Sequence, residues 1–157
     1  MDGDDSPGVK IPPPTFFVLS YILGYLLQEK LPCGNHFIQN NPLSKVIGDV
    51  FIVASLVMGF SALFQFIKTH NTFITTKPAT TLQTSGVYAI SRNPMYTGLF
   101  FFYLGLTFMM GSWWHLILLP LLYWIFKKYI IKREEAYLQR KFGQEYLNYQ
   151  AKVRRWL

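Results

Sequence analysis

Residues 80–98, TTLQTSGVYAISRNPMYTG, form a long polar interval between two strongly apolar segments of the chain. Tyr88, Arg92, Asn93 and Tyr96 lie within nine residues of one another. Pro94 stops any upstream helix and suits the first turn of the next one. The stretch therefore predicts hydrogen-bonding side chains at the mouth of an apolar helix. An ordinary polar loop between two membrane helices is the competing interpretation.

The composition indicates that much of the chain faces something other than water. Of its 157 residues, 51% are apolar and 18% are aromatic, which is high for a soluble protein of this size. The length corresponds to one domain, which we expect over residues 11–157. Residues 1–10 are rich in Asp, Pro and Gly and are expected to be disordered. They lack a basic region and a cleavage site, so we expect no signal peptide.

Four apolar runs predict an all-α integral membrane protein with about four transmembrane helices. The runs lie at about 15–27, 46–67, 95–110 and 115–131. The first run is short, so an interfacial helix is its alternative. The last two runs flank Gly111 and Ser112, which predicts an antiparallel helical hairpin. Small residues in the second and third runs favour close helix packing, among them Gly48, Gly59, Gly98 and Gly105.

The distribution of charge orients these helices. The net charge is +7, and nine of the fifteen Lys and Arg residues lie between Lys127 and Arg155, directly after the last apolar run. This is a juxtamembrane pattern, so we expect a lipid bilayer as the partner and no nucleic acid. The positive-inside rule places the central loop, the C-terminal helix and both termini on the cytoplasmic side, of the inner membrane if the protein is bacterial. The two polar regions can then meet.

The C-terminal segment carries a carboxylate in an apolar setting. Six residues recur at spacings of three and four and share one helical face: Ile130, Glu134, Leu138, Phe142, Tyr146 and Tyr149. Glu134 lies on this stripe and Glu135 does not. A carboxylate that faces inward at a membrane boundary needs a donor or a cation. A salt bridge from Glu134 to Arg92 or Arg133 is the structural alternative to a functional role.

Together these motifs resemble the isoprenylcysteine carboxyl methyltransferase and phospholipid methyltransferase superfamily, and they are closest to its small bacterial branch. The resemblance covers about residues 10–157 and rests on motifs in a fixed order. They are Gly86-Val87-Tyr88, Arg92-Asn93-Pro94-Met95-Tyr96-Thr97-Gly98, a helical hairpin, Glu134-Glu135-x-x-Leu138, Phe142-Gly143-x-x-Tyr146-x-x-Tyr149 and Val153-Arg154-Arg155-Trp156. The resemblance implies an integral-membrane methyltransferase that uses S-adenosylmethionine.

The resemblance also implies which residues form the site. The cofactor-binding positions are Thr80, Thr81, Leu82, Gln83, Tyr88, Asn93, Pro94, Met95, Tyr96 and Glu134. Arg92 and Glu134 are the candidate catalytic residues. S-adenosylmethionine carries a sulfonium, an ammonium, a carboxylate and a ribose diol, which suit aromatic faces, an acidic acceptor and a few donors. The chain has no glycine-rich dinucleotide loop, and its one cysteine and three scattered histidines predict no metal site.

Two positions depart from the eukaryotic carboxyl methyltransferases. Asn93 stands where they have His, which is a mild change because Asn still donates and accepts. Ile130 stands where they place an arginine for the substrate carboxylate. We therefore expect Ile130 to border a lipid-like or small apolar acceptor. The alternatives are a prenylcysteine carboxyl methyltransferase proper, a nicotinamide-dependent membrane reductase and a non-catalytic scaffold.

Overall fold

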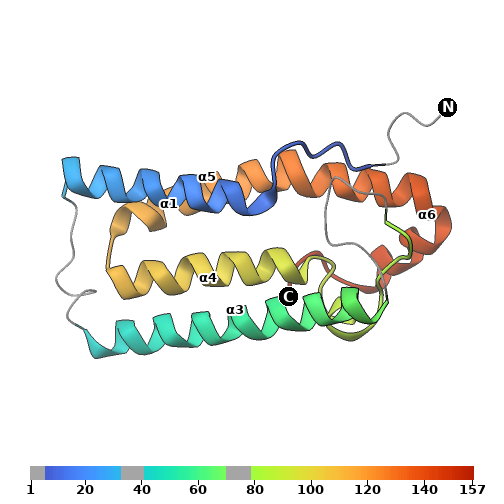
Figure 1. Cartoon of the computed structure of the whole chain (residues 1–157), viewed down its shortest axis with the longest axis horizontal. Helices are drawn as coiled ribbons and strands as arrows, with labels where there is room; N and C mark the ends of the chain where they lie inside the picture. The colour runs from blue at the N-terminus through green and yellow to red at the C-terminus, as the bar shows by residue number, and fades with distance from the viewer. Residues whose placement is uncertain (1–5, 33–40, 70–78) are drawn as a thin grey trace.

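The computed structural model describes residues 6–32, 41–69 and 79–157 (Figure 1). Over these residues the fold is all-helical, as expected, and no strand is formed. The helices are α1 (Pro13–Lys30), α3 (Pro42–Lys68), η1 (Gly86–Ala89), α4 (Pro94–Met110), α5 (Trp113–Ile125), η2 (Phe126–Ile131) and α6 (Lys132–Lys152). The four apolar runs correspond to α1, α3, α4 and α5 with η2. Proline stands in the first turn of α1, α3 and α4, where its missing N–H costs nothing.

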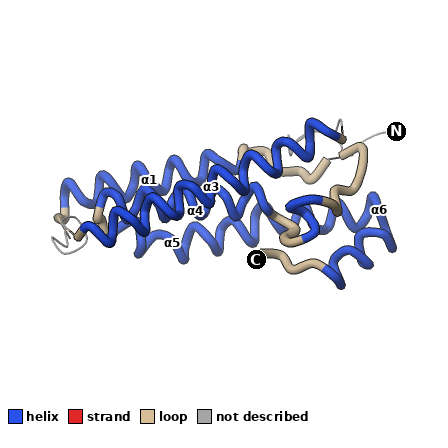
Figure 2. Tube along the Cα trace, turned by 90° about the horizontal axis from the view of Figure 1, so that it is seen from below, coloured by secondary structure: helices blue, strands red, loops and turns tan. Residues whose placement is uncertain are grey.

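The long helices form two pairs. α3 packs along α4, and α1 packs along α5 (Figure 1). Figure 2 shows the four helices running along one axis, with α6 at one end of the bundle. α4 and α5 are joined by a tight turn in which Gly111 has a φ of 66°, so the predicted hairpin is present. Each helix of the hairpin nevertheless makes most of its contacts with another partner.

The outer faces of the bundle are apolar. On α3, Val50, Val53, Phe60 and Phe64 are each at least 59% exposed. A contiguous apolar surface of this kind marks contact with lipid or with another protein. Within the described residues, α3 and the continuous helix Trp113–Lys152 are long and apolar enough to cross a membrane, and α4 is a shorter apolar helix. Two of the four expected spans are thus supported by length and composition.

Part of the N-terminal segment, for which disorder is expected over residues 1–10, makes contacts with the bundle. Val9 is only 1% exposed and belongs to the buried core, and Arg133 Nη1 donates to the Gly8 carbonyl at 3.0 Å. Residues 6–10 are therefore anchored, because a single apolar side chain among polar neighbours finds a place in the core. Residues 1–5 lie outside the described part of the chain.

Two irregularities interrupt the helix that follows α5. η2 is a single π-helical turn, and Gly143 within α6 has φ 51° and ψ −124°, far from helical values. The single face predicted from residue 130 to residue 149 is therefore broken at Gly143. Tyr146 and Tyr149 are still buried, because the second half of α6 turns back towards the central loop.

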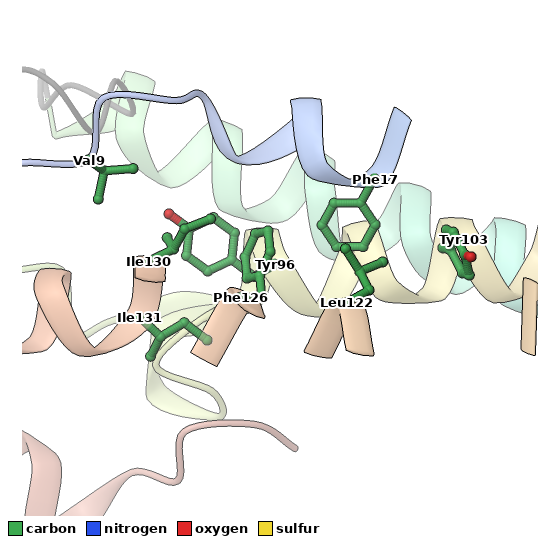
Figure 3. Close-up of a cluster of buried hydrophobic side chains, with 8 residues drawn as sticks. All are labelled: Val9, Phe17, Tyr96, Tyr103, Leu122, Phe126, Ile130 and Ile131. Atoms are coloured by element: carbon green, nitrogen blue, oxygen red, sulfur yellow. The ribbon is translucent and has the colours of Figure 1, made fainter. Parts of the chain in front are cut away.

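A buried cluster fills the end of the bundle next to α6 (Figure 3). It consists of Val9, Phe17, Tyr96, Tyr103, Leu122, Phe126, Ile130 and Ile131. The Phe126 ring lies edge-on to Phe17 at 5.1 Å and to Tyr96 at 5.0 Å between centroids. Such aromatic contacts stabilise packing beyond the area they bury. They join α1, α4 and η2, and they hold Tyr96 in one position.

The α3–α4 packing depends on glycine at Gly48. A Cβ there would lie 2.9 Å from Met109 Cγ and 3.0 Å from the Gly105 carbonyl oxygen, whereas a Cβ on Gly59 would meet nothing within 4 Å. We expect Gly48→Ala to lower the free energy of unfolding by about 1–3 kcal/mol, as overpacking does. Gly59→Ala in the same helix is the matched control and should be neutral or slightly stabilising. Unfolding in detergent measures both, and equal effects would contradict the close-packing account.

Candidate functional site

Glu134 and Tyr96 meet where α6 begins. The Tyr96 hydroxyl donates to Glu134 Oε1 at 2.5 Å, and Tyr96 is 9% exposed. Pro94 begins α4 two residues before Tyr96, so the helix presents the ring from its first turn. Tyr88 in η1 is close enough to interact electrostatically with Glu134, and its carbonyl accepts from the Tyr149 hydroxyl at 2.6 Å. The structure thus brings together three predicted site residues from separate segments.

The environment of Glu134 favours its neutral form. α6 lies beyond the apolar run, and burial there raises the pKa of Glu134 to about 7. The hydrogen bond from Tyr96 opposes this shift, and the neighbouring Glu135 carboxylate adds to it. Burial, followed by the Glu134 charge, also raises the pKa of Tyr88, which therefore keeps its hydroxyl proton. Near neutral pH the Glu134 carboxyl changes charge easily, and a cation beside it would favour the ionised form.

Glu135 forms a separate ionic cluster, which we call the arginine clamp: Arg92, Glu135 and Arg155. Arg155 makes a bidentate pair with Glu135 at 2.9 and 2.7 Å, and Arg92 Nη1 lies 3.1 Å from Glu135 Oε1. The Arg92 and Glu135 side chains are 10% and 15% exposed. The alternative salt bridge from Glu134 to Arg92 is therefore not formed. The inward-facing residue that Arg92 neutralises is Glu135.

The C-terminal residues lie across the central loop. The Arg92 backbone N–H donates to the Arg154 carbonyl at 2.9 Å, and Asn93 Nδ2 donates to the Arg155 carbonyl at 3.0 Å. Ser91 forms an isolated parallel bridge with Arg154. The two polar regions predicted to meet therefore do so, through backbone and side-chain contacts. The Asn93 amide is used, at least in part, to hold this arrangement.

The segment at residues 80–83 has a more peripheral place. Thr80 and Thr81 are exposed, whereas Gln83 is 8% exposed and its Nε2 donates to Thr81 Oγ1 at 3.0 Å. Just before it, the Ala79 N–H donates to the Tyr137 hydroxyl on α6 at 3.0 Å. The segment therefore starts against α6. Cofactor contacts by Thr80, Thr81, Leu82 and Gln83 stay a prediction.

An apolar cavity of about 600 Å³ adjoins this site. Its walls come from Pro12–Pro14 before and in α1, from residues 55–63 of α3 and from residues 95–102 of α4. Met95 and Tyr96 line it, and Tyr96 also belongs to the Glu134 site. Ile130 is 0% exposed and lies in the core rather than in this wall. Sequence reasoning missed the proline wall, although three consecutive prolines are a visible signal.

Two buried donors at this end of the bundle have no hydrogen-bond partner within the described residues: Arg92 Nε and Trp156 Nε1. The Trp156 ring packs edge-on against Phe100 and tilted against Tyr123, each at 5.7 Å between centroids. Buried donors are nearly always paired in native proteins, so both atoms are suited to a ligand or to water. Across residues 6–32, 41–69 and 79–157 no group of three His, Cys, Asp or Glu side chains is arranged to hold a metal ion.

The fold and site define a class: an all-helical protein with membrane-length apolar helices and a carboxylate-containing polar site at one end. The model of the family described as "Phospholipid methyltransferase" matches residues 43–145, and the chain belongs to this family. It is 40% identical over 72 residues to the protein-S-isoprenylcysteine O-methyltransferase of Schizosaccharomyces pombe and 38% identical over 73 residues to that of Mus musculus.

These matches cover 46% of this chain but only 30% and 26% of the two relatives. The chain thus spans less than a third of the curated methyltransferases that it matches. A third relative, an uncharacterized protein of Haemophilus influenzae, is 41% identical over 66 residues, which cover 40% of this chain and all of the relative. The relatives that this chain resembles therefore differ greatly in length.

The arginine clamp predicts a structural role for Glu135. We expect Glu135→Gln to lower the free energy of unfolding by about 1.5–3 kcal/mol, because hydrogen bonds to a charged group are lost and two guanidinium groups lose their counter-ion. It should also speed tryptic cleavage at Arg154 and Arg155. Glu145→Gln, an exposed glutamate on the same helix, is the control. Unchanged thermal stability and proteolysis in Glu135→Gln would show that the clamp is unimportant.

Proposed function

We propose that this protein is an integral-membrane, S-adenosylmethionine-dependent methyltransferase that acts on a lipid-like or small apolar acceptor at the cytoplasmic face. The observation that carries the proposal is the position of Tyr96. Its ring lines an apolar cavity, and its hydroxyl binds the partly buried Glu134. Family membership supports a methyl-transfer reaction. The chemistry then takes place where an apolar compartment meets a polar one.

The residues of the site fit the proposed cofactor. When bound, S-adenosylmethionine supplies a methyl group on a positively charged sulfur. Glu134 offers an anion for a cationic group, and the rings of Tyr88 and Tyr96 offer π faces. The unpartnered donors Arg92 Nε and Trp156 Nε1 suit the carboxylate or ribose oxygens. Asn93, Pro94, Met95 and the segment Thr80, Thr81, Leu82 and Gln83 are retained as proposed cofactor contacts.

The catalytic contribution of the protein is proposed to be alignment and exclusion of water. Displacement at the methyl carbon requires the nucleophile and the sulfur to lie in line, which a rigid site achieves without a further reagent. The aromatic cluster around Phe126 and the Trp156 ring shield the site from solvent. Arg92 is held by Glu135, so its proposed catalytic part is to orient a ligand through Nε rather than to move a proton.

The cavity favours an acceptor without a carboxylate. No cationic side chain is among the described residues that line it. Ile130 is wholly buried and shapes the core beside Tyr96, so its proposed role at the acceptor is indirect. The fission yeast and mouse relatives are named for an isoprenylcysteine substrate. If the wild-type protein prefers farnesylcysteine carboxylates over aminophospholipids and thiols, the proposed acceptor without a carboxylate is wrong.

The proposed topology has four spans with both termini in the cytoplasm, supported by the Lys and Arg distribution. α1 and α4 are shorter or less apolar than α3, so they cross the bilayer as members of the helix pairs. Reporters fused after Ser112 and after Leu157 should lie on opposite sides of the membrane. Reporters found on one side would exclude a cytoplasmic site built from the central loop and α6.

The test of function is titration of the purified protein with S-adenosylmethionine and S-adenosylhomocysteine. Glu134→Gln should weaken binding of S-adenosylmethionine about ten- to a hundred-fold, since a charge-assisted contact is lost. The pKa of Glu134 is raised to about 7, so affinity for this cation should rise as the pH increases from 6 to 8 and the carboxylate ionises. Glu134→Gln should flatten that profile.

Glu145→Gln serves again as the exposed control and should leave both affinities unchanged. Binding of NADPH in place of either cofactor would favour a membrane reductase, which the family match does not support. Binding of none of the three would favour a scaffold. Calorimetry distinguishes these results without knowledge of the acceptor.

A further inference from the structure

Tyr96 is the polar link between the apolar cavity and the carboxylate. Of the described residues that line the cavity, only Ser55 and Tyr96 carry a side-chain hydroxyl or other strong hydrogen-bonding group. Ser55 lies on α3, and Tyr96 alone of the two donates to Glu134. A nucleophile presented from the cavity therefore approaches Tyr96 before it reaches any charged group. The Tyr96 oxygen keeps a lone pair that can accept a second hydrogen bond.

We propose that Tyr96 and Glu134 form a proton relay that accepts the proton of the acceptor's nucleophile, and that the acceptor is an amine or a thiol that carries such a proton. This inference rests on the proposed methyltransferase function and makes its substrate class specific. A carboxylate acceptor has no proton to lose and would need no relay. The geometry that carries the proposal is the direct hydrogen bond between a cavity-lining tyrosine and a partly buried carboxylate.

The step balances in atoms and in charge. The lone pair of the amine nitrogen or thiol sulfur forms the new bond to the methyl carbon. The bond from that carbon to the cofactor sulfur breaks, and its electron pair stays on the sulfur as a neutral thioether. The N–H or S–H proton passes to the Tyr96 oxygen as the tyrosine proton passes to Glu134 Oε1. One sulfonium and one carboxylate are thereby replaced by two neutral groups.

This balance suits a site that is partly withdrawn from water. An unpaired charge left in such a place is costly, and the relay neutralises Glu134 at the moment the sulfonium is lost. Burial already raises the pKa of Glu134 to about 7, so the carboxyl can hold the proton and later release it to solvent. The other titratable groups that act on it are Tyr88 and Glu135, and the Glu135 charge is taken up by Arg92 and Arg155.

The experiment compares Tyr96→Phe with Tyr103→Phe. Tyr103 is a buried tyrosine of the same helix, and its hydroxyl donates to the His115 carbonyl at 3.1 Å, away from Glu134. Labelled cofactor is supplied with aminophospholipid vesicles, an alkyl thiol or a farnesylcysteine carboxylate. We expect Tyr96→Phe to slow methylation of the amine or thiol by about a hundredfold or more, which is typical of a lost acid–base group. Affinity for S-adenosylhomocysteine should fall far less than the methylation rate, because phenylalanine keeps the ring that faces the proposed cofactor site. Tyr103→Phe should behave as wild type.

Equal rates for wild type and Tyr96→Phe on the amine and thiol would overturn the relay, and so would activity confined to the carboxylate. Neither result would affect cofactor binding, which tests the methyltransferase proposal separately.

Discussion

The hydrogen bond from Tyr96 to Glu134 joins the membrane-type bundle to the polar helix that follows it. A carboxylate at that depth requires a partner, and the partner comes from the first turn of α4. Because Pro94 begins α4 two residues before it, the tyrosine is placed by the helix start rather than by a loop. The edge-on contact with Phe126 then holds the Tyr96 ring against η2. Loop motion therefore has little effect on the geometry of this pair.

The two adjacent glutamates are held in opposite ways. Glu135 meets two guanidinium groups, which compensate its charge and tie the C-terminus to the central loop. Among the described residues, Glu134 accepts a hydrogen bond from one neutral hydroxyl and forms no ion pair, so its charge state depends on what else enters the site. A buried ion pair adds little net stability but is costly to break. The arginine clamp is therefore suited to holding the C-terminal residues against the central loop, whereas Glu134 is suited to a chemical role.

Much of the fold and part of the site follow from the sequence. Apolar runs, prolines at helix starts and small residues at the α3–α4 contact predict the bundle, since each acts locally. The family resemblance implied that Tyr96 and Glu134 belong to one site, but the hydrogen bond between them was not predicted. The partner of Glu135 did not, because Gly143 takes a positive φ that turns the last helical segment back towards Arg92. Helical periodicity assumes a continuous helix, so it cannot indicate such a turn. The buried position of Val9 was not expected either, because one apolar residue among polar neighbours forms no periodic pattern.

The arrangement also shows how apolar helices and one polar helix can form a site between them. The apolar cavity is bounded by helices that the bundle already requires, together with Pro12–Pro14 at the start of α1. The polar half consists of the central loop and α6, which the arginine clamp holds together.

Tyr96 belongs to both halves, so its hydroxyl marks the boundary across which any reaction between them must occur. A proton that crosses this boundary from the acceptor, in exchange for the methyl group, keeps the polar half neutral, whereas a proton retained by the acceptor would leave a cation facing the apolar cavity. The cost of a desolvated cation in the apolar cavity therefore favours proton transfer through Tyr96 over a product that keeps the proton.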